Sequence, residues 1–512
     1  MEKIVGIDFG ACNIKTAHWR GKGTHVVRLS QNVDQNYIPN LVLYDLTRSG
    51  ALETKIGDPA KAEQDPENSI EHVKRKLELP EWSKPIPNLQ REVSASEAAA
   101  DIFRGLSEKL QSKLSCQAEE LHAVITVPVC SSGLQRSRIY QAALAAGLAV
   151  EAVITEPFAA VFSLSDVLEA EDSEETVLIF DFGGSTLDLS LVRLEHDDDG
   201  LRIEEMAAAG LPYGGIDIDA AVLKLLENKY ASVIAEIKSH DKTLEQKHTS
   251  KELRDLVTVL KEKLCEDDND SVERSCTFYG SGELREFELT RQEMEEVLRR
   301  EQVREKVFGL LDELFAQTYL NKSEVTLVKT FGGTSRIKYV LDLLTEYFGA
   351  DIFDSDDYEW EDETIADVAA GAVRYLAVRR EQPDDIEIIS QVPFSLGLAQ
   401  GKLFKKYLDF APPYGQRTKR IPLPWAELAQ RENKVSVYQC FADSEGVEIG
   451  GDDGAVYIGS AAVTPSLYKA EDGILLQMEL ADSNTLRLIF SEMGESGLKE
   501  IETQIINLNA NV

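Results

Sequence analysis

Two short apolar runs, each ending in an acidic residue and a glycine turn, stand out in the hydrophobic pattern of the chain. The first covers residues 4–7 and leads into Asp8, and the second covers residues 177–180 and leads into Asp181. Apolar runs of this length between turn residues predict buried strands, and the alternating positions that follow each turn predict a second strand. The chain therefore repeats one strand–turn–strand unit, which predicts two similar half-domains that face each other across a cleft.

Between and after these two units, apolar strands alternate with helical patterns. This alternation predicts a sheet with helices packed against it. Thr290 and Glu293 form a capping box that predicts the start of one further helix. We predict the other helices over 95–115, 134–147, 217–265 and 363–380, and the other strands over 123–127, 152–155, 276–289 and 325–330.

Helical periodicity almost vanishes beyond the polar segment 381–385. Short alternating runs separated by Gly, Asp, Asn and Pro predict strands over 435–440, 456–459, 474–480 and 486–490. This change of character predicts a separate all-β domain. We therefore divide the chain into a first domain over 1–383, a linker over 384–391 and an all-β domain over 392–512.

The glycines of the repeated unit suggest phosphate binding. Gly183 and Gly184 allow the backbone to approach an anion closely and to present several N–H donors. A carboxylate at the strand end, such as Asp181, can hold a hydrated Mg²⁺ beside the phosphates. A single Asp-Phe-Gly-Gly turn is equally consistent with a plain hairpin, but its second copy at Asp8 favours the phosphate site. A further glycine turn at 331–336, between a strand and a helix, also suits a nucleotide.

Composition limits the classes of partner. The chain has 512 residues, of which 43% are hydrophobic and 28% charged, with a formal net charge of −36. This charge argues against a general affinity for nucleic acid or anionic membranes, and we favour a role in solubility over an acidic binding face. The six cysteines show no zinc-site spacing, and we find no signal peptide or apolar run of membrane length. We expect a cytoplasmic protein in a reducing compartment.

The order of these features resembles the DnaK-type, seventy-kilodalton heat-shock chaperone family. The resemblance extends from the segment 4–8 through 392–397 to the final strands. Each motif alone is shared with actins and sugar kinases, whereas their order together with the β-domain is specific. The resemblance implies an α/β actin-like ATPase domain of two duplicated lobes, followed by an all-β sandwich substrate-binding domain. It also implies ATP or ADP with Mg²⁺ between the lobes.

The resemblance assigns roles to residues that match the family motifs. Asp8 and Asp181 would hold Mg²⁺, and the catalytic residues would be Lys74, Glu156, Asp181 and Thr186. The residues that would contact the nucleotide lie in the glycine turns and in one helix: Asp8, Gly10, Ala11, Cys12, Asn13, Gly183, Gly184, Ser185, Gly214, Gly215, Lys261, Gly332, Gly333, Ser335 and Arg336.

Two of the assigned positions have a simpler interpretation when the residues are taken alone. Lys74 lies in a basic run, 68–76, which by itself is typical of a solvated helix face. Pro128 alone would be a strand stop, whereas the family uses this proline and the arginine matched by Arg136 to couple the two domains. In both cases the match to the family motif favours the functional interpretation.

Several positions depart from the family pattern. Ala11 and Cys12 replace two threonines, and because two hydroxyl donors near the phosphates are lost, we expect slower hydrolysis. Cys12 could be an oxidation-sensitive thiol, but we favour a small space-filling residue. Thr258 and Cys265 replace a glutamate and a serine near the adenosine, which predicts weaker nucleotide affinity or looser base selectivity. Glu387 interrupts the apolar linker, which puts interdomain signalling in doubt.

The C-terminal region differs further. In the family a helical lid follows the β-domain, whereas this chain ends at Val512 after the last matching strand. We therefore expect a lid-less member with weak or transient client binding. The segment 420–427 has no counterpart in the family pattern and could rearrange one side of the peptide cleft.

Two functions from different classes follow. The first is an ATPase: an ATP-dependent, chaperone-like protein whose nucleotide state regulates the binding of unfolded peptide or protein clients in the β-domain, with co-chaperones as further partners. The alternative is an ATP-sensing adaptor or exchange-factor-like module that holds one dedicated protein partner and hydrolyses little ATP. The altered first hairpin favours the adaptor, and the retained Lys74, Glu156 and Thr186 favour the chaperone. A sugar kinase or filament-forming actin relative would share the ATPase fold, but the β-domain argues against it.

Overall fold

The computed structural model describes most of the chain. The described residues are 2–21, 23–32, 35–63, 65–79, 81–164, 168, 174–197, 200–243, 246–266, 270–278, 282, 284–349, 367–381, 386–389, 395–408, 417–440, 448–449, 455–470, 473–482, 485–494 and 497–507.

A mixed sheet forms the base of the first lobe. Its strand order is β11 (Ala149–Thr155), β10 (Leu121–Val127), β1 (Lys3–Phe9), β2 (Asn13–Arg20) and β3 (Gly23–Val26), and β4 (Tyr37–Pro39) also pairs with β2. The apolar side chains of β10 and, apart from the partly buried Ile4, of β1 are fully buried, because both faces of these central strands are covered. β1 and β2 form the first predicted hairpin, and β1 also pairs in parallel with β10.

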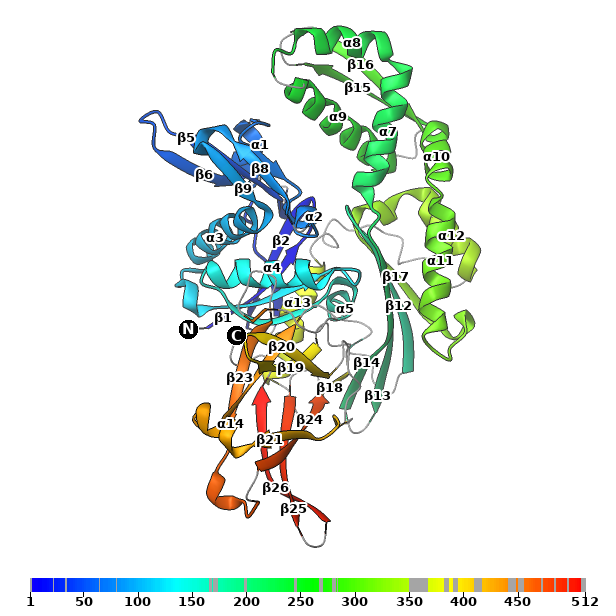
Figure 1. Cartoon of the computed structure of the whole chain (residues 1–512). Coiled ribbons are helices and arrows are strands. Elements are labelled where there is room, and N and C mark those ends of the chain that lie inside the picture. Colours follow the sequence, from blue (N-terminus) through cyan, green and yellow to red (C-terminus); the bar gives the residue numbers. More distant parts are fainter. Residues whose placement is uncertain are drawn as a thin grey trace.

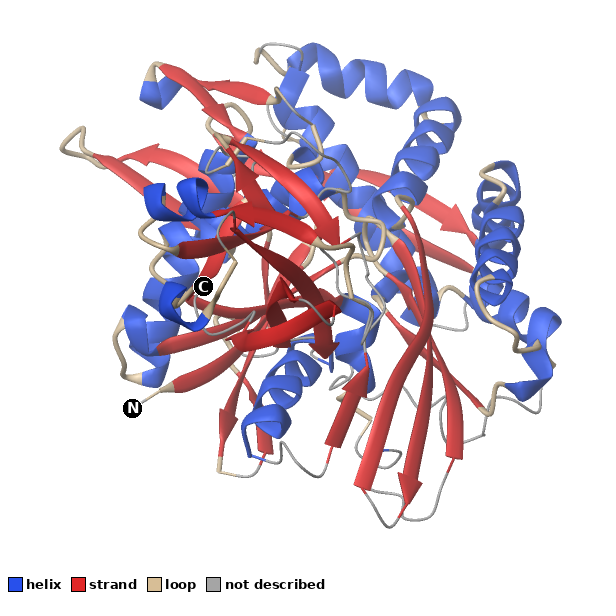
Figure 2. Ribbon diagram, turned by 60° about the horizontal axis from the view of Figure 1, so that its bottom comes forward, coloured by secondary structure: helices blue, strands red, loops and turns tan. Residues whose placement is uncertain are grey.

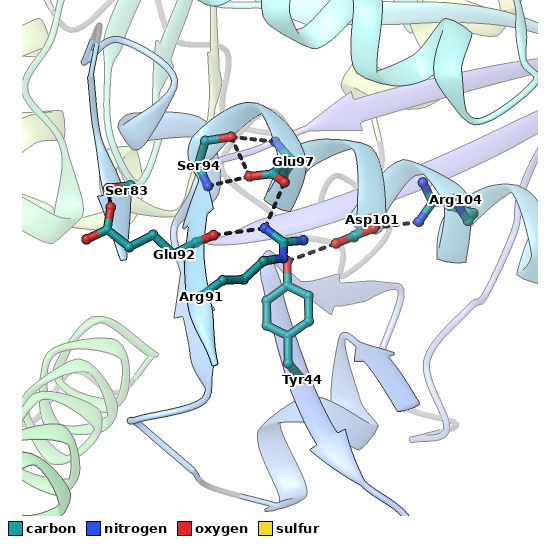
Figure 3. A network of polar contacts seen from close by, with 8 residues as sticks. All are labelled: Tyr44, Ser83, Arg91, Glu92, Ser94, Glu97, Asp101 and Arg104. Carbon is teal, nitrogen blue, oxygen red and sulfur yellow. Dashed lines mark hydrogen bonds and ion pairs between the residues drawn. The ribbon is translucent and has the colours of Figure 1, made fainter. Parts of the chain in front are cut away.

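A smaller subdomain rises from this lobe. It contains β5 (Leu41–Leu46), β6 (Leu52–Ile56), β7 (Ser69–Glu71), β8 (Ser83–Ile86), β9 (Arg91–Ser94), α1 (Asp58–Glu63), α2 (Val73–Lys76), η1 (Pro87–Leu89) and α3 (Ala95–Leu114). Ser94 and Glu97 form a capping box that begins α3. Tyr44 on β5 donates a hydrogen bond to Asp101 on α3, at 2.9 Å, and so ties the sheet to the helix (Figure 3).

A second sheet supports the second lobe. Its order is β17 (Leu327–Phe331), β12 (Glu174–Phe182), β13 (Leu187–Asp197), β14 (Gly200–Leu211) and β18 (Ile386–Ile389). β12 and β13 form the second predicted hairpin, with Asp181 opposite Asp188. The two hairpins therefore belong to separate lobes, which stand on either side of Figure 1, the first in blue and cyan and the second in green.

Helices and one hairpin complete the second lobe. They are α7 (Gly215–Lys229), α8 (Ala231–His240), α9 (Lys247–Glu266), β15 (Ser271–Thr277), β16 (Leu284–Thr290), α10 (Arg291–Arg300), α11 (Val303–Ala316), η4 (Lys322–Glu324), η5 (Gly333–Arg336) and α12 (Lys338–Phe348). The single helical region predicted over 217–265 is thus three helices. The first break lies at Tyr230, whose backbone leaves the helical region (φ −116°, ψ 30°).

The two lobes meet at a pair of helices that lie between their sheets and cross each other. α5 (Glu156–Val161) and α13 (Asp367–Glu381) lie between the two sheets (Figure 1), while α4 (Gly133–Ala145) and η2 (Ala118–Glu120) belong to the first lobe. Gly371 on α13 meets α5 backbone to backbone, since a Cβ there would lie 1.9 Å from the Ala159 carbonyl oxygen. Likewise, a Cβ at Gly6 on β1 would lie 2.1 Å from the Ala369 carbonyl oxygen. The crossing therefore depends on two glycines that have no side chain.

The C-terminal part is a sandwich of two four-stranded sheets. Figure 2 draws all strands of the molecule in red, those of the sandwich included. One sheet has the order β20 (Leu403–Leu408), β19 (Ser395–Gln400), β22 (Lys434–Cys440) and β23 (Val456–Ala462). The other has the order β21 (Ile421–Pro424), β24 (Gly473–Asp482), β25 (Thr485–Gly494) and β26 (Gly497–Asn507), and η9 (Pro465–Leu467) precedes β24.

The segment 420–427, for which the sequence predicts no counterpart in the family, forms β21 and the start of α14 (Trp425–Gln430). β21 pairs antiparallel with β24 at the edge of the second sheet. Trp425 donates a hydrogen bond to the Ala470 carbonyl, at 2.8 Å, and packs on Tyr468. The segment is therefore an integral part of the sandwich, and its effect on a peptide cleft stays a prediction.

The β-domain packs on the first lobe, and the linker strand joins the sheet of the second lobe. Its buried apolar residues form one continuous cluster with those of the first lobe. β18, from the middle of the predicted linker, pairs in parallel with β14 and extends the second lobe's sheet. The rest of the predicted linker, including both of its boundaries, and the segment 391–394 lie outside the described residues. None of the described helices is long and apolar enough to cross a membrane.

Candidate functional site

The turns of the two hairpins open onto one cleft of about 660 Å³ between the lobes. Its walls come from β1, β2, α2, α5, β12, α13 and the turns after β1, β12 and β17. The lining residues are Asp8, Gly10, Ala11, Cys12, Asn13, Lys15, Lys74, Glu156, Asp181, Gly183, Gly184, Ser185, Thr186, Phe331, Gly332, Gly333 and Val368. The structure thus brings together residues that are up to several hundred positions apart in the chain.

Most residues assigned by the sequence lie on this lining, and the remainder lie beside it. Gly214 and Gly215 begin α7, directly behind the second hairpin turn. Lys261 is on α9, where its ammonium group lies 3.4 Å from the Gly215 carbonyl oxygen. Ser335 and Arg336 are in η5, which follows Gly332. Among the lining residues, Lys15, Phe331 and Val368 were not predicted.

The first hairpin turn is held by the subdomain above it. The Asn40 side chain donates a hydrogen bond to the Gly10 carbonyl, at 2.7 Å. The ring of His72 lies 3.1 Å from the Ala11 carbonyl oxygen. A Cβ at Gly10 would lie 2.3 Å from the Asn13 carbonyl oxygen, so glycine is required for this tight turn. The turn is therefore fixed before any ligand binds.

The second hairpin turn packs backbone against backbone with two other glycine turns. The Gly215 N–H donates to the Gly183 carbonyl, at 3.1 Å. A Cβ at Gly214 would lie 2.5 Å from the Ser185 nitrogen. Gly332 has φ +80°, and a Cβ there would lie 2.6 Å from a carboxylate oxygen of Asp181. Because side chains would fill this space, the three turns form a backbone cradle of the kind that suits phosphate groups.

An ion pair lies at the base of the cleft. The ammonium group of Lys74 donates a hydrogen bond to Glu156, and the two residues are only 1% and 8% exposed. Burial opposes the charged form of Lys74. The negative charges of Glu156 and Asp8 outweigh this effect, so the pKa of Lys74 is raised. Burial raises the pKa of Glu156, and Lys74 offsets this only in part. Lys74 is therefore the charged partner at neutral pH, and Glu156 is the group that can take up a proton.

Further carboxylates surround this pair. Burial, followed by the charge of Glu156, raises the pKa of Asp181 well above its ordinary value. Asp188, on the strand beside it, is fully buried and accepts a hydrogen bond from the Val129 N–H at 2.8 Å. Burial also raises the pKa of Asp188, although a hydrogen bond from Thr186 opposes the rise. Several acidic groups held in one buried place favour a bound cation.

The donor set fits Mg²⁺ held together with phosphate. Asp8 and Asp181 provide hard carboxylate oxygens from the two facing hairpins. Within the part of the chain that the structure describes, no group of three or more His, Cys, Asp or Glu could hold a metal ion alone. Since Mg²⁺ usually keeps several waters and binds through one or two carboxylates plus phosphates, this arrangement suits it.

Asp188 is a site residue that the sequence interpretation did not assign. The sequence contains a signal that could have identified Asp188. It stands two positions after Thr186 in the same alternating run, so the two side chains are expected on the same side of the sheet. The structure links it through Val129 to a loop that ends at α4. Arg136 on that helix donates hydrogen bonds to the carbonyls of Val129 and Ser131, at 2.8 and 3.0 Å. The Pro128–Arg136 segment is therefore in direct contact with the base of the cleft.

The residues for which the sequence predicts an adenosine contact form a second polar group, on α7 and α9. Lys261 pairs with Asp219 at 2.7 Å, and the Thr258 hydroxyl donates to the same carboxylate at 2.9 Å. Across the cleft, Arg75 contacts both carboxylate oxygens of Asp217 at 3.0 Å. Thr258 thus supports Asp219, and the Arg75–Asp217 pair connects the two lobes.

Cys12 packs between the two hairpins. A Cβ at Gly184 would lie 2.5 Å from its sulfur atom, so the thiol fills the space left by this glycine. Burial raises the pKa of Cys12 to about 11. The thiol is therefore protonated at neutral pH, a form with little nucleophilic reactivity.

Comparison with known proteins gives concordant matches. The family model described as Hsp70 protein matches residues 4–409. The chaperone protein DnaK of Thermotoga neapolitana is 28% identical over 448 residues, which cover 86% of this chain and 70% of the relative. The DnaK proteins of Thermosipho africanus and Thermoplasma acidophilum are 28% and 26% identical, over 86% and 78% of this chain and 70% and 62% of their own lengths.

Proposed function

This chain belongs to the Hsp70 family, and we propose that it is an ATP-dependent, chaperone-like ATPase. Its fold is accordingly the actin-like ATPase fold in two lobes, followed by a β-sandwich domain. In this proposal the cleft binds ATP or ADP with Mg²⁺ and hydrolyses ATP slowly. The nucleotide state then regulates the binding of unfolded peptide or protein clients in the β-domain, with co-chaperones as further partners.

One observation carries the proposal for the cleft. Two hairpins from separate lobes each present a carboxylate, Asp8 or Asp181, beside glycine turns that face one cleft. A nucleotide with its metal is the ligand that needs both a backbone cradle and opposed carboxylates. A plain hairpin turn would need neither the burial of the acidic groups nor their convergence.

The cleft's own residues suit phosphoryl transfer to water. When bound, MgATP would supply the phosphoanhydride and the metal charge that neutralises its phosphates. Lys74 and Glu156, paired and buried, are placed to orient a water molecule, and the raised pKa of Glu156 lets it accept a proton near neutral pH. The Thr186 hydroxyl lines the same cleft and can donate a hydrogen bond to a phosphate oxygen.

Slow hydrolysis follows from the first hairpin. Ala11 and Cys12 line the cleft but carry no hydroxyl group. Their backbone N–H groups remain available to phosphates, whereas side-chain hydrogen bonds that would strengthen in the transition state are missing. The site is therefore better equipped for binding than for turnover.

Two structural links support regulation of the β-domain by the cleft. Asp188 and Lys74 connect to the segment 128–136 through hydrogen bonds from the Val129 N–H and from Gln135 to the Lys74 carbonyl, both at 2.8 Å. β18 adds to the sheet that carries the second hairpin. A change at the cleft can thus reach the linker through one sheet.

Equilibrium binding tests the nucleotide site. Labelled ATP should bind the full chain, more tightly with Mg²⁺ than with a chelator, and Asp181→Asn should remove most of this Mg²⁺ dependence. Asp342→Asn is the matched control, because Asp342 lies on α12, outside the cleft lining, with a 60% exposed side chain that pairs with Lys338 in the same helix. The absence of ATP binding by the unaltered chain would refute the proposal.

The missing hydroxyls at Ala11 and Cys12 also favour the second candidate, an ATP-sensing adaptor with a dedicated protein partner and little hydrolysis. The two candidates differ in their response to a generic unfolded peptide. ATP binding that leaves peptide release unchanged, together with a single co-purifying protein, would support the adaptor.

A further inference from the structure

Lys15 is a cleft residue to which neither the repeated motif nor the family pattern assigns a role. It follows the first hairpin turn on β2 and stands opposite Asp8 in the antiparallel register of β1 and β2. Its ammonium group lies 3.4 Å from a carboxylate oxygen of Asp8. It also lines the cleft together with the phosphate-binding turns. Lys15 therefore places a positive charge at the phosphate end of the cleft.

Lys15 and Lys74 are the cationic side chains among the described lining residues, and they differ in how firmly they are held. Lys74 is almost fully enclosed, with a 2% exposed side chain, and is hydrogen-bonded to Glu156. The side chain of Lys15 is 19% exposed and its pair with Asp8 is longer than an ordinary hydrogen bond. Lys15 is thus the cation that is held less firmly, and it can change partner when another cation takes its place at the buried Asp8 carboxylate.

The position of Lys15 also addresses the unusual first hairpin. Ala11 and Cys12 offer only backbone donors to a phosphate, and the Cys12 thiol is packed against Gly184. A lysine three residues after Cys12, on the strand that leaves the same turn, adds a charged donor close to these N–H groups. Ammonium groups form charge-assisted hydrogen bonds to phosphate that are stronger than those of a hydroxyl.

We propose that Lys15 is a phosphate-binding residue of this cleft: its ammonium group leaves Asp8 and binds the β- or γ-phosphate when nucleotide enters. The exchange frees the Asp8 carboxylate for Mg²⁺, so that a single step both neutralises the phosphate and exposes a metal ligand. Lys15 then performs part of the task of the missing hydroxyl groups. This inference rests on the proposed nucleotide binding and adds a specific contact to it.

A purely structural role for Lys15 makes a different prediction. If Lys15 only neutralised Asp8, its removal would affect the cleft whatever ligand binds there. If it binds a β- or γ-phosphate, its removal should affect ADP and ATP but not adenosine or AMP, which lack these groups. A series of ligands that differ only in phosphate number therefore separates the two roles.

The test is isothermal titration of adenosine, AMP, ADP and ATP into the full chain, with Mg²⁺ and with a chelator. For Lys15→Met we expect ADP and ATP to bind about 10- to 100-fold more weakly in the chelator, the loss for one charged hydrogen bond. Adenosine and AMP should bind as they do to the unaltered chain. Lys15→Arg, which keeps the charge, should retain most of the affinity for ADP and ATP.

Lys338→Met is the matched control, since Lys338 lies on α12 with a 60% exposed side chain. It should not change any of the four affinities. The inference is overturned if Lys15→Met binds ADP and ATP as tightly as the unaltered chain does, or if it loses adenosine to the same extent. If the unaltered chain binds none of the four ligands, the proposed function itself is refuted, and this inference with it.

Discussion

At the scale of single residues, one buried ion pair sets the chemistry at the base of the cleft. Lys74 and Glu156 are each removed from solvent, so each depends on the other for compensation. The raised pKa of Glu156 means that this carboxyl can also become neutral at modest cost. In the proposed function, the pair would position a water molecule and Glu156 would receive its proton.

Replacement of Lys74 by methionine should abolish most hydrolysis while leaving nucleotide binding largely intact. Glu156 would become protonated, because its pKa is already raised and its partner is gone, and could no longer accept a proton. We expect the single-turnover rate of ATP cleavage to fall by at least about 100-fold, the contribution typical of a positioned acid or base. Lys338→Met serves as control, and an equal rate for both variants would contradict the assigned role.

The hydroxyl-free hairpin gives a gain-of-function prediction. Ala11→Thr with Cys12→Thr should raise the single-turnover rate of ATP cleavage by about tenfold. This is the rate increase expected from one hydrogen bond made in the transition state. Ala11→Val with Cys12→Val has the same shape without the hydroxyls and controls for packing against Gly184. If the double-threonine variant is no faster than the double-valine variant, the missing hydroxyls do not limit hydrolysis.

The sequence identifies some residues of the site and not others for a physical reason. Asp8 and Asp181 follow apolar strands and precede glycine turns, so local pattern alone finds them. Lys15 reaches the cleft only because β2 pairs back onto β1, and Asp188 matters because Val129 from another lobe donates to it. Such roles depend on strand register and on tertiary contact, which a linear pattern does not contain.

At the scale of elements, the crossing of α5 and α13 brings two helix backbones into direct contact. Gly371→Ala should destabilise it by about 1–3 kcal/mol or more, because the added methyl group meets the Ala159 carbonyl and backbone has to move. Gly309→Ala, in α11, is the matched control: nothing lies within 4 Å of its Cβ position, and alanine favours a helix. Thermal unfolding should show a lower midpoint for the first variant only.

A carboxylate of the β-sandwich predicts a pH dependence. Hydrogen bonds from Arg417, and then from Arg487, hold the pKa of Glu479 on β24 below its ordinary value. Its ionised form therefore stabilises the folded domain at pH values above about 4.3, the unfolded value, and this contribution is lost as the pH falls through the lower folded value.

Glu479→Gln should accordingly lower the unfolding midpoint at pH 7, and the difference from the unaltered chain should shrink below about pH 4. Glu432→Gln, at a side chain that is 85% exposed, should have little effect at any pH. A difference for Glu479→Gln that stays constant from pH 7 to pH 3 would show that its two arginine contacts do not carry the stabilisation.

The sequence predicts which segments are helices or strands better than it predicts where a helix is interrupted. Both hairpins, the all-β region and most helices follow from periodicity. The region 217–265 was predicted as one helical stretch because its charged pattern continues through Tyr230 and Asp241. The second break is made by the Asp241 carboxylate, which accepts hydrogen bonds from the N–H groups of Thr243 and Thr249 at 3.0 and 2.8 Å. Such local competition with the helix is not visible in hydrophobic periodicity.

At the scale of the whole molecule, the linker joins the sheet of one lobe while the sandwich packs on the other. β18 could be predicted from the sequence as an apolar segment. Its pairing with β14 could not, because strand pairing depends on the tertiary structure and not on the local sequence. Glu387, which interrupts the apolar run, lies 3.6 Å from Arg202 on β14. The departure from the family pattern is thus matched by a cation on the neighbouring strand.

In the proposed function, nucleotide in the cleft controls binding in the β-domain. The most direct test is the rate at which a labelled, generic unfolded peptide leaves the full chain, measured with and without ATP and Mg²⁺. We expect ATP to accelerate release and Asp181→Asn to abolish the acceleration. An unchanged release rate while ATP is bound would contradict it.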